Sequence, residues 1–202
     1  GAEALVAELR AMGAEARVVA CDVADPTALA AALGSTDGIV GVVHCAGVLD
    51  DGLIAQQTPA RLAAVFAPKA AAAWQLHLAT RTQPLDFFVL FSSATALLGA
   101  PGQTNYAAAN AFLDSFAQYR RATGRAALAI NWGAWAEIGL AARMSSPLNL
   151  AKQGIRAMPP RLALAALSHA MHHHGAQLGV FDIDWRTYQL NKKSQAFLAA
   201  FQ

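Results

Sequence analysis

The sequence contains few charged residues and only two cysteines. Charged residues make up 14% of its 202 positions, the formal net charge is +2, and the basic pair Arg120-Arg121 is not part of a longer basic run. Nucleic acid is therefore not expected as a partner, because neutralising phosphates requires clustered positive charge. Cys21 and Cys45 lie in apolar, strand-like stretches. This favours buried thiols over a disulfide framework and indicates a reducing, cytoplasmic environment.

Long hydrophobic runs are also missing. No apolar stretch approaches the roughly 20 residues that a membrane-spanning helix requires. The first residues lack the basic-then-apolar pattern of a signal peptide. We therefore expect a soluble protein with no membrane partner.

The motifs of two site classes are absent as well. His172-His173-His174 could suggest a metal site, but consecutive positions on a helix point in different directions and cannot all reach one ion. We therefore expect no metal. A serine hydrolase is excluded because no Gly-x-Ser-x-Gly elbow occurs.

The hydrophobic content and its pattern predict a single α/β domain. Hydrophobic residues make up 55% of the chain, which suffices for a sizeable core. Helical and strand-like segments alternate, which is typical of a doubly wound, Rossmann-like parallel sheet. The expected strands are residues 16–21, 39–45, 87–92, 127–131 and 178–181.

Cap residues place three helices. An amphipathic helix is expected over residues 1–12, and a second over residues 26–33 with Asp25 as its N-cap. Pro68 suits the first turn of a third helix. Residues 138–160 interrupt the alternation and indicate a mobile lid, with an ordinary surface loop as the alternative.

A glycine-rich phosphate-binding turn is not present. Dinucleotide-binding folds hold the pyrophosphate on a Gly-x-Gly-x-x-Gly turn at the first helix N-terminus. No such pattern occurs in this sequence. We therefore expect residues 1–202 to be the C-terminal, catalytic portion of such a domain, lacking the first strand, that turn and the second strand. Alone it should bind a cofactor poorly.

Four polar residues indicate carbonyl reduction. Tyr106 and Asn110 are one helical turn apart on a shared face, and Ser93 ends the apolar run 87–91, where a buried strand opens into a cleft. With Lys69 they could protonate a developing alkoxide. Taken singly, a tyrosine on an Ala-rich helix is usually a packing residue, and a lysine is usually a surface charge.

The pattern resembles the short-chain dehydrogenase/reductase superfamily, and specifically the ketoreductase domain of modular type I polyketide synthases. Several motifs occur in the family's order and spacing, and the resemblance covers nearly all of the chain. The motifs are Val43-His44-Cys45-Ala46-Gly47-Val48, Lys69 followed by Trp74 and His77, Phe91-Ser92-Ser93, Asn105-Tyr106-Ala107-Ala108-Ala109-Asn110-Ala111-Phe112-Leu113-Asp114, and Asn131-Trp132-Gly133-Ala134-Trp135.

The resemblance implies a role for each of the four residues. Tyr106 would be the proton donor, and Lys69 would lower the pKa of its phenol. Ser93 would hydrogen-bond the substrate carbonyl. Asn110 takes the position, four residues after the tyrosine, where most of the superfamily has the lysine. The implied reaction is NADPH-dependent reduction of a β-ketoacyl thioester on an acyl carrier protein, beside other synthase domains of the same polypeptide.

The resemblance also implies cofactor contacts. Asp22-Val23 would hold the adenine ring, although Asp22 could instead be a helix cap. The backbone of His44-Cys45-Ala46-Gly47 would lie against the ribose. Asn131-Trp132-Gly133 would pass beside the nicotinamide carboxamide, with Trp132 equally plausible as a core residue. The preference for NADPH over NADH rests on the resemblance alone.

The last implied feature is stereochemical. Leu49-Asp50-Asp51 resembles the mark of B-type ketoreductases, which make the D-configured alcohol. No tryptophan occurs in residues 94–105, so the A-type signature is lacking, and Ala108 stands where one B subtype has proline. A solvated turn carboxylate is the alternative for Asp51. A non-catalytic scaffold and a free-standing reductase of small ketones remain the alternative functions.

Overall fold

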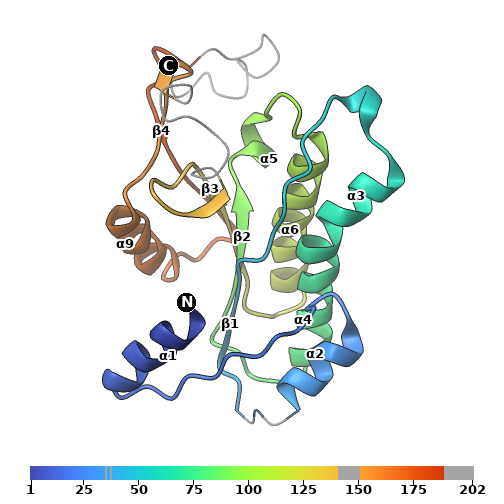
Figure 1. Cartoon of the computed structure of the whole chain (residues 1–202), viewed down its shortest axis with the longest axis vertical. Helices are drawn as coiled ribbons and strands as arrows, with labels where there is room; N and C mark the ends of the chain where they lie inside the picture. Colours follow the sequence, from blue (N-terminus) through green and yellow to red (C-terminus); the bar gives the residue numbers. More distant parts are fainter. Residues whose placement is uncertain (35, 37, 141–150, 189–202) are drawn as a thin grey trace.

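A computed structural model describes residues 1–34, 36, 38–140 and 151–188 (Figure 1). Its centre is a parallel sheet with the strand order β1-β2-β3-β5. These strands are Gly41–His44, Phe87–Ser93, Leu128–Trp132 and Gln177–Val180. They fall where four of the five expected strands were placed, so the predicted α/β class with a parallel sheet is confirmed.

Helices cover both faces of the sheet, as a doubly wound fold requires (Figure 1). On β2, Phe88 and Leu90 belong to the core cluster under α4 (Ala72–Thr80) and α6 (Thr104–Ala122). Val89 lies between them in sequence but joins the opposite cluster, under α9 (Pro160–Ala170). This alternation is the two-residue period of a strand buried on both sides.

Cap chemistry explains the second helix. Helix α2 (Pro26–Leu33) has the bounds expected from the sequence, and the Asp25 carboxylate accepts hydrogen bonds from the backbone of Thr27 at 2.8 Å and Ala28 at 3.2 Å. Helix α1 (Ala2–Ala11) also forms where it was expected, but it buries none of its residues.

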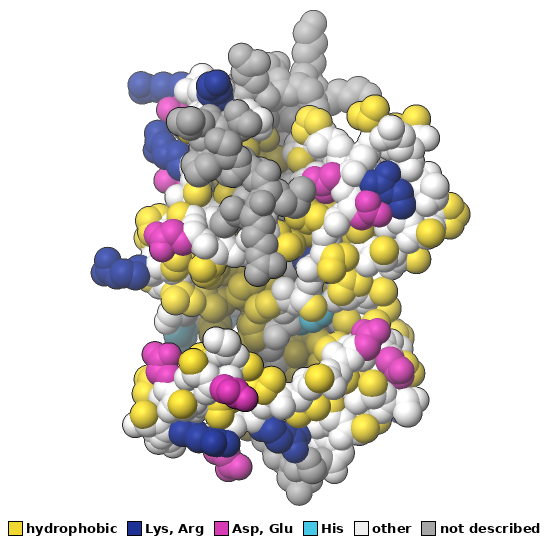
Figure 2. Space-filling view, in the orientation of Figure 1, with side chains coloured by type: hydrophobic (Ala, Val, Ile, Leu, Met, Phe, Trp, Pro, Cys, Tyr) yellow, Lys and Arg dark blue, Asp and Glu magenta, His cyan; other side chains and the backbone are white. Residues whose placement is uncertain are grey.

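The predicted strand at residues 16–21 is wrong, because this segment forms no strand. A strand needs a neighbour for its backbone hydrogen bonds, and no described residue pairs with this segment. Val18 and Val19 are 60% and 47% exposed, so neither face of the segment is buried. Val43, on the edge strand β1 of the sheet, is also exposed. Figure 2 shows hydrophobic side chains around a hollow in the middle of the molecule.

The helix that carries Lys69 begins earlier than predicted. Helix α3 (Pro59–Phe66) starts behind the Thr58 cap and continues through a π-helical turn, η2 (Ala67–Ala71), into α4. Pro68 therefore lies inside a continuous helical segment and not in a first turn. A proline has no N–H to donate and crowds the preceding turn, and the wider π turn accommodates this at the point where Lys69 must reach inward.

Residues 151–160 of the predicted lid are held by backbone pairing, whereas residues 141–150 lie outside the described part. Strand β4 (Ile155–Arg156) pairs with β6 (Asp182–Ile183), and the amide of Met158 donates to the Ala134 carbonyl at 2.9 Å. The remaining short elements are η1 (Ile54–Gln56) and α5 (Thr95–Leu98). Among the described helices, none is long and apolar enough to span a bilayer.

Candidate active site

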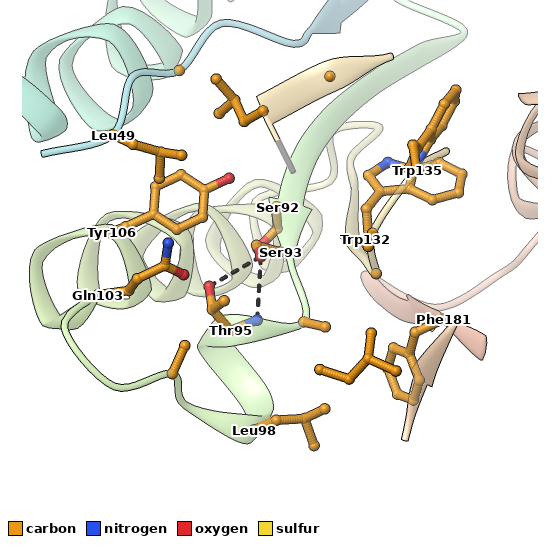
Figure 3. Close-up of a pocket in the computed structure, with 18 of the residues that line it drawn as sticks. Leu49, Ser92, Ser93, Thr95, Leu98, Gln103, Tyr106, Trp132, Trp135 and Phe181 are labelled. Carbon is orange, nitrogen blue, oxygen red and sulfur yellow. Dashed lines mark hydrogen bonds between the residues drawn. The ribbon is translucent and has the colours of Figure 1, made fainter. Parts of the chain in front are cut away.

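A cavity of about 1310 Å³ lies at the carboxyl ends of the parallel strands. This is where open α/β sheets place their ligands. Figure 3 shows Leu49 and Tyr106 together on one side of the cavity, Trp132 and Trp135 on the other, and Ser93 between them. The end of β2 supplies Ser93 and the N-terminal part of α6 supplies Tyr106. The fold thus brings together side chains that are 13 positions apart in sequence.

Lys69 also lines this cavity, although its side chain is almost entirely buried. Its side chain is only 3% exposed, and the π turn directs its ammonium to the Phe91 carbonyl, to which it donates at 2.9 Å. The same nitrogen lies over the Tyr106 ring, 5.3 Å from the ring centroid. Burial lowers the pKa of Lys69 to about 8. The lysine is therefore charged at neutral pH, but its proton is held weakly.

His44 supports the turn that carries the lysine. Its Nε2 lies 3.1 Å from the Lys69 carbonyl oxygen, which can only accept, so the ring donates from this nitrogen. Burial lowers the pKa of His44 to about 4, so the imidazole is neutral at physiological pH. The structure thus places His44 behind the lysine, and it is not among the residues lining the cavity.

The expectation that the pKa of Tyr106 is lowered is wrong for this structure. Burial raises the pKa of the phenol and outweighs the lowering by the Asn110 and Ser93 side chains. The physical reason is geometric. The ammonium of Lys69 bonds to a carbonyl and faces the ring, so its charge is not directed at the phenol oxygen.

A buried polar network lies beneath the catalytic candidates. The Asn110 side-chain amide donates to the Tyr106 backbone carbonyl at 2.8 Å, and the Asn110 backbone carbonyl accepts from the Ser92 hydroxyl at 3.2 Å. The Asn131 amide contacts Ser92 Oγ at 3.0 Å and Asp114 Oδ2 at 2.8 Å. Burial raises the pKa of Asp114. Asn110 and Asn131 are both fully buried and do not line the cavity. The Asn131 side chain and the Asn110 backbone carbonyl fix α6 against β2 and β3, whereas the Asn110 side chain bonds within α6.

The residues expected at the cofactor fall into two groups. Cys45, Gly47, Trp132 and Gly133 line the cavity, while Asp22, Val23 and Ala46 do not. Trp132 also belongs to the core cluster under α9, so its interpretation as a core residue is confirmed, and its contact with the cofactor stays a prediction. Asp22 is not a helix cap, because its carboxylate bonds to the Ala24 amide at 2.9 Å and Asp25 caps α2.

The Leu49-Asp50-Asp51 loop is fastened by three side chains. Arg61 donates to Asp50 Oδ1, with Nη2 at 2.6 Å and Nε at 3.0 Å, and also to the Asp51 carbonyl. Gln103 donates to Asp51 Oδ2 at 2.9 Å. Asn105 donates to the Asp50 carbonyl at 2.8 Å and accepts from the Tyr106 amide at 2.8 Å. The loop is thereby tied to the start of the helix that carries Tyr106.

Both carboxylates of this loop are therefore hydrogen-bonded, but Asp51 is exposed, so the alternative of a solvated turn carboxylate stays open for it. Arg61 lowers the pKa of Asp50. Sequence reasoning gave no role to the three residues that hold this loop, which are Arg61, Gln103 and Asn105. For Gln103 and Asn105 a signal existed, since they lie three positions and one position before Tyr106. Arg61 carries none, because it reaches the loop only through the fold.

Comparison with known proteins identifies the family. A family model described as "KR domain" matches residues 1–137. Polyketide synthase GfsB of Streptomyces halstedii is 46% identical over 191 residues, which are 93% of this chain and 3% of that protein. GfsA of the same organism is 45% identical over 203 residues, covering 99% of this chain and 3% of its own length. A solved A1-type ketoreductase superposes with a TM-score of 0.89 at 39% identity, over 98% of this chain and 42% of the other. The chain therefore belongs to the ketoreductase domain family of modular polyketide synthases, within the short-chain dehydrogenase/reductase superfamily.

Proposed function

We propose that this chain reduces a β-ketoacyl thioester, carried on an acyl carrier protein, to a β-hydroxyacyl thioester at the expense of NADPH. The observation that carries the proposal is the meeting of Ser93, Tyr106 and Lys69 at one cavity of a ketoreductase-family fold. A scaffold that had lost catalysis would have no need to keep an ammonium buried beneath a tyrosine ring, because burying that charge is costly.

The side chains divide the work as follows. Ser93 donates a hydrogen bond to the substrate carbonyl and orients it. The nicotinamide, when bound, supplies the hydride. As charge builds on the carbonyl oxygen, Tyr106 transfers its phenolic proton to that oxygen. The raised pKa of the phenol keeps that proton in place until then. The Lys69 ammonium lies over the Tyr106 ring, 5.3 Å from its centroid, so it attracts the negative charge that the resulting phenolate spreads into the ring until a proton returns from solvent.

The residues present fit a nicotinamide cofactor. The cavity exceeds the range of about 300–1,000 Å³ that holds one drug-sized ligand, so there is room for the reactive end of a dinucleotide beside an acyl chain. Two of the residues that line the cavity, Gly47 and Gly133, have no space for a side chain. A Cβ would lie 2.9 Å from Lys69 Cε at position 47 and 2.6 Å from Phe181 Cβ at position 133. The choice of NADPH rests on the family resemblance.

We further propose B-type stereochemistry, giving the D-configured alcohol. Leu49 lies beside the Tyr106 ring on one side of the cavity, so the loop can restrict the side from which an acyl chain approaches (Figure 3). Asp50 and Asp51 act indirectly, because Arg61 and Gln103 occupy their carboxylates. The partners proposed are the acyl carrier protein and the other synthase domains of the polypeptide, in the cytoplasm.

Product analysis tests this proposal. The full-length protein is incubated with a β-ketoacyl thioester of N-acetylcysteamine and either NADPH or NADH, and the product is resolved by chiral chromatography and mass spectrometry. We expect the D-configured β-hydroxy thioester, formed faster with NADPH. An L-configured product would contradict the B-type assignment alone, whereas no reduction with either nucleotide would refute the reductase proposal.

A further inference from the structure

Thr95 places a second hydroxyl beside the one expected to hold the substrate. Its Oγ1 lies 3.0 Å from Ser93 Oγ, and its backbone amide donates to the same Ser93 oxygen at 3.2 Å (Figure 3). Both residues line the cavity. Two contacts to one hydroxyl fix its position more tightly than either contact alone.

The hydrogen count at Ser93 decides what these contacts do. A serine hydroxyl has one proton and two lone pairs, and a backbone N–H can only donate. The Thr95 amide therefore occupies one lone pair of Ser93. If the Thr95 hydroxyl occupies the other, the single proton of Ser93 is left to point into the cavity. A carbonyl oxygen can only accept, so this is the arrangement in which every group is satisfied once a ketone binds.

The backbone around Thr95 holds this geometry in place. The Ala94 amide donates to the Trp132 carbonyl at 2.8 Å, so the chain stays paired with the end of β3 before it turns into α5. The hydroxyl of Thr95 does not cap this short helix, because Ala94 is the N-cap and makes no side-chain cap. The Thr95 side chain is thus available to Ser93.

We propose that Thr95 is a positioning residue that directs the proton of Ser93 toward the substrate carbonyl. The inference rests on the proposed reductase function. A donor behind Ser93 also polarises its O–H bond, so Ser93 becomes the stronger hydrogen-bond donor through cooperativity. Thr95 does not touch the reacting atoms, and its whole effect passes through Ser93.

Double-mutant cycles in the full-length protein test this dependence. Thr95→Val removes the hydroxyl and keeps the branched shape, while Thr95→Ser keeps the hydroxyl. Each is made alone and with Ser93→Ala. We expect Thr95→Val to lower kcat about fivefold, the worth of one neutral hydrogen bond. We expect Thr95→Ser to restore the rate, and Thr95→Val to add nothing to Ser93→Ala.

A binding measurement separates this inference from the reductase proposal. The dissociation constant of the β-ketoacyl thioester is measured calorimetrically with NADP⁺ present, so no turnover can occur. We expect Thr95→Val to weaken binding about threefold or more, and only when Ser93 is intact. Equal losses with and without Ser93, or no loss at all, would overturn the role of Thr95. If Thr95→Val weakens binding only when Ser93 is intact, but the wild-type protein reduces no substrate with NADPH, the reductase proposal is refuted and the role of Thr95 in binding stands.

Discussion

Burying the Lys69 ammonium should cost folding stability, and the cost can be worked out. The pKa of this lysine falls from 10.5 to about 8, and each pKa unit is worth roughly 1.4 kcal/mol, so burial of the charge opposes folding by about 3 kcal/mol at neutral pH. An apolar replacement would leave the Phe91 carbonyl without this donor, now at 2.9 Å, which costs about 1 kcal/mol. A net gain in stability of about 2 kcal/mol is therefore expected from such a replacement.

Replacing this lysine by an apolar residue of similar length should therefore stabilise the protein while destroying activity. We expect Lys69→Met to raise the melting temperature of the cofactor-free protein at pH 7 by about 4–8 °C. The sign with pH follows from linkage. The folded state binds this proton less tightly than the unfolded state, so the penalty is complete below pH 8 and disappears as the pH rises to 10.5. The advantage of Lys69→Met should shrink over the same range.

Thermal melts of the full-length protein at several pH values between 7 and 10 measure this difference. Lys152→Met is the matched control, because Lys152 is exposed and its replacement should leave the melting temperature unchanged. A Lys69→Met protein that melts below the wild type at pH 7 would refute the reasoning. A stabilisation that grows with pH would refute it as well.

Three further changes test other parts of the site. Gly47→Ala should reduce kcat about tenfold with little loss of stability, because a Cβ there would lie 2.9 Å from Lys69 Cε and displace a flexible side chain; steady-state kinetics and a thermal melt measure this. Arg61→Gln should lower the ratio of D to L alcohol about fivefold by releasing the Leu49-Asp50-Asp51 loop, whereas the control Arg156→Gln, at an exposed ion pair, should leave the chiral chromatogram unchanged. Asn131→Ala should lower the free energy of unfolding by about 3 kcal/mol, or the melting temperature by about 6–12 °C, because it removes the hydrogen bonds of Asn131 to Asp114 and Gln177; a loss no larger than that of Gln177→Ala would contradict this.

Much of the sheet could be predicted from the sequence because its strands are local signals. The run Phe87–Ser93 is apolar on both faces, and it forms a strand with helices on both sides. The Asp25 cap is equally local, and α2 begins directly after it. By contrast, Val18 and Val19 carry the same apolar signal, but no strand forms there. Hydrogen-bond pairing depends on neighbours that a local pattern does not contain.

The sequence predicts which residues meet at the site, but not the pKa shifts of those residues or the local backbone that carries them. Motif spacing places Ser93, Tyr106 and Lys69 together, and the structure does bring them to one cavity. The direction of the pKa shift of Tyr106 could not be inferred, because it depends on how deeply the phenol is buried and where the ammonium points. The π turn that contains Lys69 was also missed, since Pro68 more often signals the start of a helix.

The most direct test of the account is a single-turnover measurement on Tyr106→Phe, with Tyr119→Phe as the control on the same helix. The full-length protein is mixed with excess NADPH and a β-ketoacyl thioester, and loss of nucleotide absorbance is followed in stopped flow, after NADPH binding has been checked by fluorescence. We predict unchanged NADPH binding in both variants, wild-type reduction by Tyr119→Phe, which alters a half-exposed ring, and a loss of about 100-fold or more in Tyr106→Phe. Reduction at the wild-type rate by Tyr106→Phe would show that the proton comes from another group and would contradict the account.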